Sequence, residues 1–200
     1  VNAYGKDLKM EDGFTQLLVA VAKTGIERIS FYTSHPRDYS ETTIDAMRDY
    51  PNIMPFLHLP VQSGSNEVLR RMARGYTVER YKQLYDDLKK KVPHIAFTTD
   101  LIVGFPNETD EEFEATLDLV RYCRFDMAYA FIYSPRAGTP AANMEDNIPL
   151  EVKKERLARL NDLLTEIAEE NNRRFLGQTV SVLCIGTSKR NREVYSGYSA

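Results

Sequence analysis

The chain has 200 residues, of which 42% are hydrophobic, so it can bury one full-sized core and is not expected to be disordered. Its formal net charge of -3 gives no overall attraction to nucleic acid, so any RNA contact must come from a local basic patch or a missing segment. No stretch approaches the roughly 20 apolar residues of a membrane helix, and the start lacks the pattern of a secretory signal, so we expect a cytoplasmic protein.

Short β-rich runs alternate with longer segments of helical period, which is the pattern of βα units that feed a parallel sheet. We expect strands at 29–33, 56–59, 96–103 and 127–133. Two expected helices can cover this sheet, and their apolar faces carry Phe14, Leu17, Leu18 and Val21 in the first and Tyr81, Leu84, Tyr85 and Leu88 in the second.

Helix signals continue after the third strand. Thr109 and Glu112 form a capping-box pattern, which predicts that a helix begins directly after Thr109. A long helix is expected over 150–174, where Glu155 precedes Arg159 by the four residues that favour an ion pair.

The last part of the chain changes character. Runs at 179–185 and 193–195 read as strands joined by a polar turn, which predicts one hairpin of a small all-β module. Two strands are marginal by themselves, so the module is expected to be incomplete. We therefore divide the chain into an α/β domain, 1–174, and the beginning of a second domain, 175–200.

The cysteines do not suggest a metal centre. Cys123 and Cys184 lie far apart and form no CxxC pair, so this chain supplies no thiolate set for zinc or an iron–sulfur cluster. We interpret both as buried free thiols, and we expect no metal ligands.

Polar residues follow the predicted strands, where ligands bind in barrels and open α/β sheets. They are Ser34 and His35 after the first strand, Gln62 and Ser63 after the second, Asp100 within the third, and Tyr133, Ser134 and Arg136 after the fourth.

The segment HLPVQSGSNEVLRRMARGYT, 58–77, is the most informative part of the chain. Gln62 precedes a helix start, where its amide could bind a ribose or a carboxylate; the alternative is an ordinary Ser/Asn helix cap with Gln62 solvated. His58 faces away from Leu57 and Leu59 and would point into a barrel, either as a satisfied core histidine or as a catalytic group.

Asp100 lies in an apolar strand, where a carboxylate needs hydrogen-bond donors. A pair of ligand hydroxyls would supply them, and neighbouring backbone amides are the alternative. Gly104 in the following loop would let a flat group such as an adenine approach the backbone. Arg136, in a turn bounded by Pro and Gly, could bind phosphate or carboxylate or could be solvated.

Two local basic runs have nucleic-acid potential, although such runs are more often solvated surface. They are 70–74, which contains Arg70, Arg71 and Arg74, and 189–192, which contains Lys189, Arg190 and Arg192.

Taken together, the motifs resemble the radical S-adenosylmethionine methylthiotransferases, most closely the branch that thiomethylates an isopentenyl-adenosine beside the anticodon of tRNA. The resemblance covers nearly the whole chain and rests on motifs in family order, which are VNAY (1–4), TSHP (33–36), HLPVQSGS (58–65), RGYT (74–77), DLIVGFP (100–106) and YSPRAGTPAA (133–142).

This resemblance implies a partial, TIM-like (βα)6 radical S-adenosylmethionine barrel followed by the start of a TRAM-like RNA-binding module. It implies that Gln62 and Asp100 hold the ribose hydroxyls of S-adenosylmethionine, that Arg74 binds its methionine carboxylate, and that Ser34 and Gly104 add contacts. His58, Tyr133 and Arg136 would border the substrate pocket, and Lys189, Arg190 and Arg192 would contact the tRNA anticodon loop.

The chain also departs from the family pattern. The family carries a CxxxCxxC loop upstream of what is Val1 here and a further cluster on an N-terminal domain. The two [4Fe-4S] clusters would therefore not be ligated by this chain. Because the chain begins at Val1 and stops at Ala200 after strand-like sequence, we expect a truncated piece that is inactive alone and that could dimerise through an exposed sheet edge.

Other functions remain open at this stage. A methylthiotransferase that modifies an aspartate of a ribosomal protein would share the fold and the cofactors. A non-catalytic RNA-binding module would use Arg190 and Arg192. An unrelated aldolase-type barrel could use Asp100 or His58 as an acid–base group, but it would need a buried lysine or metal ligands at strand ends, which the sequence does not indicate.

Overall fold

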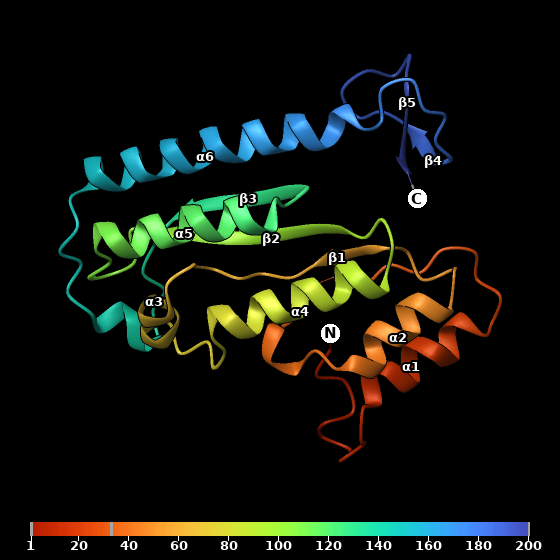
Figure 1. The fold of residues 1–200 in the computed structure, drawn as a ribbon, viewed down its shortest axis with the longest axis horizontal. Coiled ribbons are helices and arrows are strands. Elements are labelled where there is room, and N and C mark those ends of the chain that lie inside the picture. The colour runs from red at the N-terminus through yellow and green to blue at the C-terminus, as the bar shows by residue number, and fades with distance from the viewer. Residues whose placement is uncertain (1, 33, 200) are drawn as a thin grey trace.

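The computed structural model describes residues 2–32 and 34–199, so the first residue of VNAY and the first of TSHP lie outside the described ranges. Its main sheet is parallel, in the order β1-β2-β3, with helices in the connections (Figure 1). The strands are β1 (Phe56–His58), β2 (Ala96–Val103) and β3 (Met127–Ile132). The helices are α1 (Gly13–Ala22), α2 (Glu41–Asp49), α3 (Asn66–Arg71), α4 (Val78–Lys91), α5 (Asp110–Cys123) and α6 (Leu150–Arg173), with short 3-10 turns at Pro36–Asp38 and Pro140–Asn143.

The prediction of a strand at 29–33 is wrong as a regular element, and Thr33 lies outside the described residues. Ile29 forms an isolated parallel bridge with Ile53, and the segment meets β1 again where Ser34 N donates to His58 O at 3.2 Å. Between these points, Phe56 N donates to Met54 O at 2.8 Å across Pro55. This local turn uses the donor that a continuous ladder would need.

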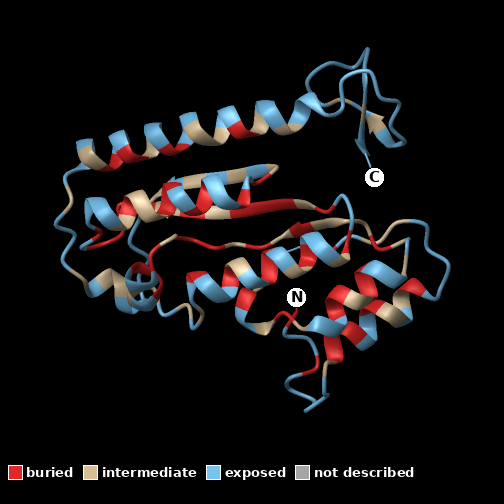
Figure 2. Cartoon of the chain, in the orientation of Figure 1, coloured by how far each residue is buried: buried red, intermediate tan, exposed pale blue. Residues whose placement is uncertain are grey.

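One face of the sheet forms the core. Leu57, Phe97 and Leu101 are 0% exposed and belong to one cluster of buried side chains that includes residues of α4 and α5. Figure 2 shows buried positions along β2 and on both helices. Burial of each such side chain contributes roughly 1.5–3 kcal/mol, which is what holds α4 and α5 on this face. The expected face of α4 is confirmed, whereas Leu17 of α1, expected on the packed face, is 37% exposed.

The other face of the sheet is open. Along β3 the side chains alternate, so that Met127, Tyr129 and Phe131 are 52%, 52% and 53% exposed while the residues between them pack against the core. Because Asp100 pairs with Tyr129 in the parallel register, it lies on this same open face.

The helices near the carboxyl end of β2 largely follow the predictions. The capping box of α5 is confirmed, since Thr109 Oγ1 accepts from Glu112 N at 3.2 Å and Glu112 Oε2 accepts from Thr109 N at 3.0 Å. The expected pair between Glu155 and Arg159 is not among the described ion pairs. Arg159 contacts Glu114 of α5 instead, because α6 packs across α5.

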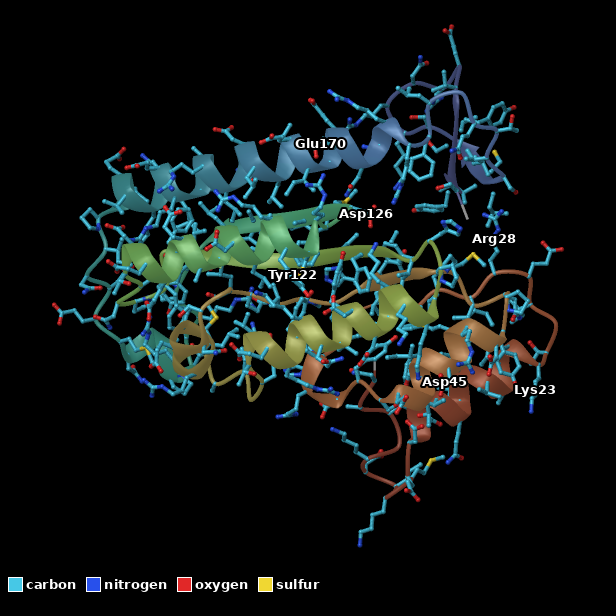
Figure 3. All side chains as sticks on the ribbon, in the orientation of Figure 1. Lys23, Arg28, Asp45, Tyr122, Asp126 and Glu170 are labelled. Atoms are coloured by element: carbon cyan, nitrogen blue, oxygen red, sulfur yellow. The ribbon has the colours of Figure 1, made fainter. Side chains whose placement is uncertain are left out.

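The end of α6 is fastened to the start of β3, far from the carboxyl ends of the strands (Figure 3). Asp126 Oδ2 accepts from Phe97 N at 2.8 Å, and Asp126 Oδ1 accepts from Arg174 at 2.6 Å. Glu170 contacts Arg124 in the same region. These contacts fix the direction in which α6 leaves the sheet.

An antiparallel hairpin follows α6, formed by β4 (Val182–Thr187) and β5 (Tyr195–Ser199). The hairpin was expected, but both strands begin later than predicted. Ser188 N donates to Val194 O at 2.8 Å and closes the turn further along the chain, so β4 runs past its predicted end and β5 starts after the turn. Arg28 donates to Tyr198 O at 3.1 Å and to Ser181 Oγ at 3.2 Å, which joins the hairpin to the N-terminal half (Figure 3).

The cysteines differ from each other. Cys123 is buried, and burial raises the pKa of its thiol to about 12. Cys184 is exposed on the hairpin, so the prediction that it is buried is wrong; among the described residues no second layer covers that strand. No helix within the described ranges is long and apolar enough to cross a membrane.

Candidate functional site

Gln62 lies beside β2 with a backbone conformation that residues other than glycine seldom adopt. Its backbone has φ 72°, and it is bonded on both sides, because Gln62 N donates to Asp100 O and Ile102 N donates to Gln62 O, each at 2.9 Å. The residue is 6% exposed. A left-handed backbone of this kind costs about 1–3 kcal/mol and persists only where neighbours impose it.

The alternative interpretation of this segment is half right. Ser65 does cap α3, accepting from Val68 N at 3.3 Å. Gln62, however, is buried rather than solvated.

His58, Thr98 and Asp100 form a polar cluster on the open face of the sheet. His58 Nδ1 lies 2.9 Å from Thr98 Oγ1, and His58 Nε2 lies 3.5 Å from Asp100 Oδ2. Leu57 and Leu59 point into the core at 0% exposure, so the predicted orientation of His58 is confirmed. His58 is therefore a partnered histidine that also faces the open side.

The carboxylate of Asp100 keeps room for further donors. Its side chain is 30% exposed, and its described polar contact is with His58; no backbone amide in the described ranges donates to it. A carboxylate has about four acceptor positions. The alternative in which neighbouring amides satisfy Asp100 is therefore wrong, and a ligand with paired hydroxyls fits the remaining positions.

Ser34 and Arg74 carry buried polar atoms without partners in the part of the chain that the structure describes. Ser34 is 2% exposed, and its Oγ is unbonded, as is Arg74 Nε. The two loops lie side by side, since the His35 and Tyr76 ring centres are 5.4 Å apart. Burial, and then the cation of Arg37, lower the pKa of His35, and Arg74 and Lys6 act in the same direction. Buried polar groups are normally hydrogen-bonded, so these atoms indicate a ligand position.

The arginines that precede Gly75 have separate roles. Arg70 pairs with Glu67 at 2.9 Å and Arg71 with Glu112 at 2.6 Å, so both are used within the chain. Arg74 takes part in none of the ion pairs found among the described residues, and its Nε is buried without a hydrogen-bond partner there. Its guanidinium is the one in this run that can receive an external carboxylate.

The other residues predicted for the site differ in burial and in their position in the fold. Tyr133 packs edge-on against Phe105 at 4.9 Å between ring centres, and its hydroxyl is buried without a partner among the described residues. Arg136 is exposed in the turn that follows. Lys189, Arg190 and Arg192 are exposed at the turn of the hairpin, at the far end of α6 from α3 (Figure 1).

The expected space at Gly104 is filled on one side. Gly104 has φ 69°, but a Cβ there would lie 2.5 Å from Lys153 Cγ, and its amide already donates to Glu108 Oε2 at 2.8 Å. A larger residue is therefore excluded at this position because its side chain would collide with Lys153, and not because the position borders open space on that side. Sequence reasoning missed Lys153 and Arg156, although both interrupt the apolar face of α6 at helical spacing, which is the signal that could have found them.

One stability prediction follows from Asp38, near His35. Its hydrogen bonds with Arg37 and Lys6 outweigh burial and lower the pKa of its carboxyl to about 2. A lowered pKa stabilises the fold above about pH 4 and the effect is lost as pH falls through about 2. We expect Asp38→Asn to lower the free energy of unfolding by about 1 kcal/mol at pH 7, since both partners are solvent-exposed, and by progressively less from pH 4 to pH 3. Urea denaturation at these pH values measures it, and a loss independent of pH would contradict it.

Comparison with known proteins agrees with this architecture. The sequence model of the Radical SAM superfamily matches residues 4–120, and the chain belongs to this superfamily. It is 54% identical over 200 residues to the tRNA-2-methylthio-N(6)-dimethylallyladenosine synthase of Geobacillus kaustophilus, covering 100% of the chain and 38% of that relative. It is 53% identical to the enzyme of the same name from Bacillus cytotoxicus, of which it covers 39%.

The chain thus spans about two fifths of the length of the curated relatives it matches. Among solved structures, coproporphyrinogen III oxidase from Escherichia coli, a radical SAM enzyme, matches with a TM-score of 0.61 and 22% identity over 78% of this chain and 37% of that one. At this identity the match supports the fold alone, and the predicted radical SAM barrel of mixed α/β structure is confirmed at that level.

Proposed function

We propose that the enzyme of which this chain forms a part transfers a methylthio group to isopentenyl-adenosine in the anticodon loop of tRNA, using S-adenosylmethionine bound at the carboxyl ends of the parallel strands. The observation that carries the proposal is the convergence of Gln62, Asp100 and Ser34 around β1 and β2, with buried polar atoms left for a ligand. The choice of this particular reaction is based on the names of the two bacterial relatives described above.

Each side chain has a task that suits its chemistry. Asp100 accepts from the ribose hydroxyls, and the Gln62 amide bonds beside it. The guanidinium of Arg74 binds the methionine carboxylate through a bidentate fork, and Ser34 Oγ contributes a further bond. Gly104 lines the adenine side through its backbone.

The substrate side of the pocket is assigned to His58, Tyr133 and Arg136. His58 and Tyr133 border the open face of β2 and β3, and Arg136 can reach a phosphate. When bound, S-adenosylmethionine and two [4Fe-4S] clusters supply the radical and sulfur chemistry, while the residues of this chain orient the reactants and exclude water. No cluster of possible metal ligands occurs among the described residues.

We also propose the division of the chain into a barrel, 1–174, and the start of a TRAM-like RNA-binding domain, 175–200. The antiparallel hairpin and the exposure of Lys189, Arg190 and Arg192 at its turn support contact with tRNA phosphates. Pairing of two copies through a sheet edge stays a prediction, which sedimentation at high concentration tests.

The decisive experiment uses the full-length enzyme with reconstituted clusters, given isopentenylated tRNA or ribosomal protein in parallel. We expect the methylthio nucleoside in digested tRNA by mass spectrometry and no modified aspartate. Modification of the ribosomal protein alone would favour the related methylthiotransferase, and tRNA binding without cleavage of S-adenosylmethionine would favour a non-catalytic RNA-binding module. The matched negative control is tRNA that lacks the isopentenyl group.

A further inference from the structure

Helix α6 buries two cations against the loop that follows β2. Lys153 and Arg156 are 4% and 5% exposed, although lysine and arginine are seldom fully buried. They are three residues apart and therefore share one face of the helix. Neither was assigned a role in the site above.

Arg156 forms a buried ion pair with Glu108. Its Nη1 donates to Glu108 Oε2 at 2.8 Å and to Glu108 O at 3.1 Å, and its Nη2 donates to Asp110 Oδ1 at 2.7 Å. The same Glu108 oxygen accepts from Gly104 N at 2.8 Å, and the Glu108 side chain is 0% exposed. The guanidinium thus reaches the backbone of Gly104 through one carboxylate.

Lys153 completes the contact from the same helix. Its stem fills the space beside Gly104, and its Nζ bonds to Asp146 Oδ1 at 2.6 Å. The Nζ also lies 5.9 Å from the centre of the Tyr133 ring. One face of α6 therefore touches both the loop after β2 and the residue after β3.

We propose that Arg156 and Glu108, together with Lys153, are positioning residues that hold the backbone at Gly104 and the Tyr133 ring in the geometry that binds S-adenosylmethionine. This inference rests on the proposed function and deepens it. A buried ion pair is weak evidence for stability, because desolvation offsets most of its attraction. Here Glu108 Oε1 and Arg156 Nε are also buried without partners among the described residues, which adds to the free-energy cost of the pair. The loop geometry that the pair holds therefore explains its presence better than a gain in stability does.

The structure offers a matched control on the same helix. Arg159 also pairs across to α5, with Glu114, and also lies over the Phe113 ring, at 5.1 Å compared with 5.6 Å for Arg156. Its side chain is 46% exposed, and its polar partner among the described residues is Glu114, which lies outside the Gly104 loop. Arg159→Met therefore removes a similar pair without disturbing the proposed contact.

The test measures binding of S-adenosylmethionine to the full-length enzyme with reconstituted clusters by calorimetry, and hydrogen exchange of the peptide that contains Gly104. We expect Arg156→Lys to weaken this binding on the order of tenfold or more and to speed exchange of the Gly104 amide. Its affinity for tRNA should stay within about twofold of wild type, as should both affinities of Arg159→Met.

A double variant separates positioning from stability. In Glu108→Gln with Arg156→Met no charge is left buried alone, so we expect a melting temperature close to that of wild type but binding of S-adenosylmethionine weakened about tenfold. Wild-type affinity in this variant, or an equal loss in Arg159→Met, would overturn the inference alone. A wild-type enzyme that does not bind S-adenosylmethionine would overturn the proposed function and this inference with it.

Discussion

Replacement of Asp100 by alanine in the full-length enzyme is expected to weaken binding of S-adenosylmethionine by about 100-fold or more. Hydrogen bonds to a charged group contribute about 1.5–3 kcal/mol each, and loss of two bonds to ribose hydroxyls exceeds the roughly 2.7 kcal/mol that corresponds to a factor of 100. Asp100 is placed for this by the backbone bond from Gln62 and by His58 at 3.5 Å. Equilibrium dialysis with labelled ligand measures the effect.

The conservative and control variants sharpen this test. Asp100→Asn keeps the shape but removes the charge, so we expect an intermediate loss of about tenfold. Asp118→Ala removes an acid from an exposed pair with Arg121 on α5, with its side chain 73% exposed, and should bind as wild type does. Binding by Asp100→Ala that equals the binding by Asp118→Ala would remove Asp100 from the cofactor site.

The second large effect is on folding, and it concerns Gly64, between Gln62 and α3. A Cβ at Gly64 would lie 2.3 Å from Ala115 O and 2.6 Å from Thr116 Cα, so α5 would have to move away. The bond from Gly64 N to Thr116 Oγ1, at 2.9 Å, would be lost with it. We expect Gly64→Ala to lower the free energy of unfolding by about 3 kcal/mol or more, measured by urea denaturation.

A second glycine gives the control for backbone conformation. Gly25 has φ 84°, and no atom of the described residues lies within 4 Å of a Cβ placed there, so Gly25→Ala tests backbone strain without a collision. Its expected cost is about 1–2 kcal/mol. Equal losses in the two variants would show that α5 does not press on Gly64 as the structure indicates.

Much of the fold could be predicted because periodicity reports burial directly. Strand β2 matches its predicted range of 96–103, and α5 begins where its capping pattern indicates. The prediction of a strand at 29–33 was wrong because Phe56 N, a donor that a continuous ladder would need, bonds to Met54 O in the turn around Pro55. The sequence of the failing strand contains no sign of this.

The site divides in the same way. The orientation of His58, away from the core-facing Leu57 and Leu59, follows from alternation along β1 and could be predicted. The absence of an acidic partner for Arg74 among the described residues could not be predicted, because it depends on Glu112, on α5, pairing with Arg71. The contact of Arg156 with Glu108 likewise depends on how α6 docks across the sheet, which the helical pattern does not specify.

At Gln62, the left-handed backbone lowers the stability of the fold, while the side chain has a proposed role in ligand binding. Glycine there would relieve some of the roughly 1–3 kcal/mol of backbone strain and so stabilise the fold, yet it would remove the side-chain amide to which we assign the proposed ribose contact. Engineering for heat resistance should therefore leave this residue unchanged, since the backbone strain at Gln62 cannot be removed without also losing the side chain that we assign to ligand binding.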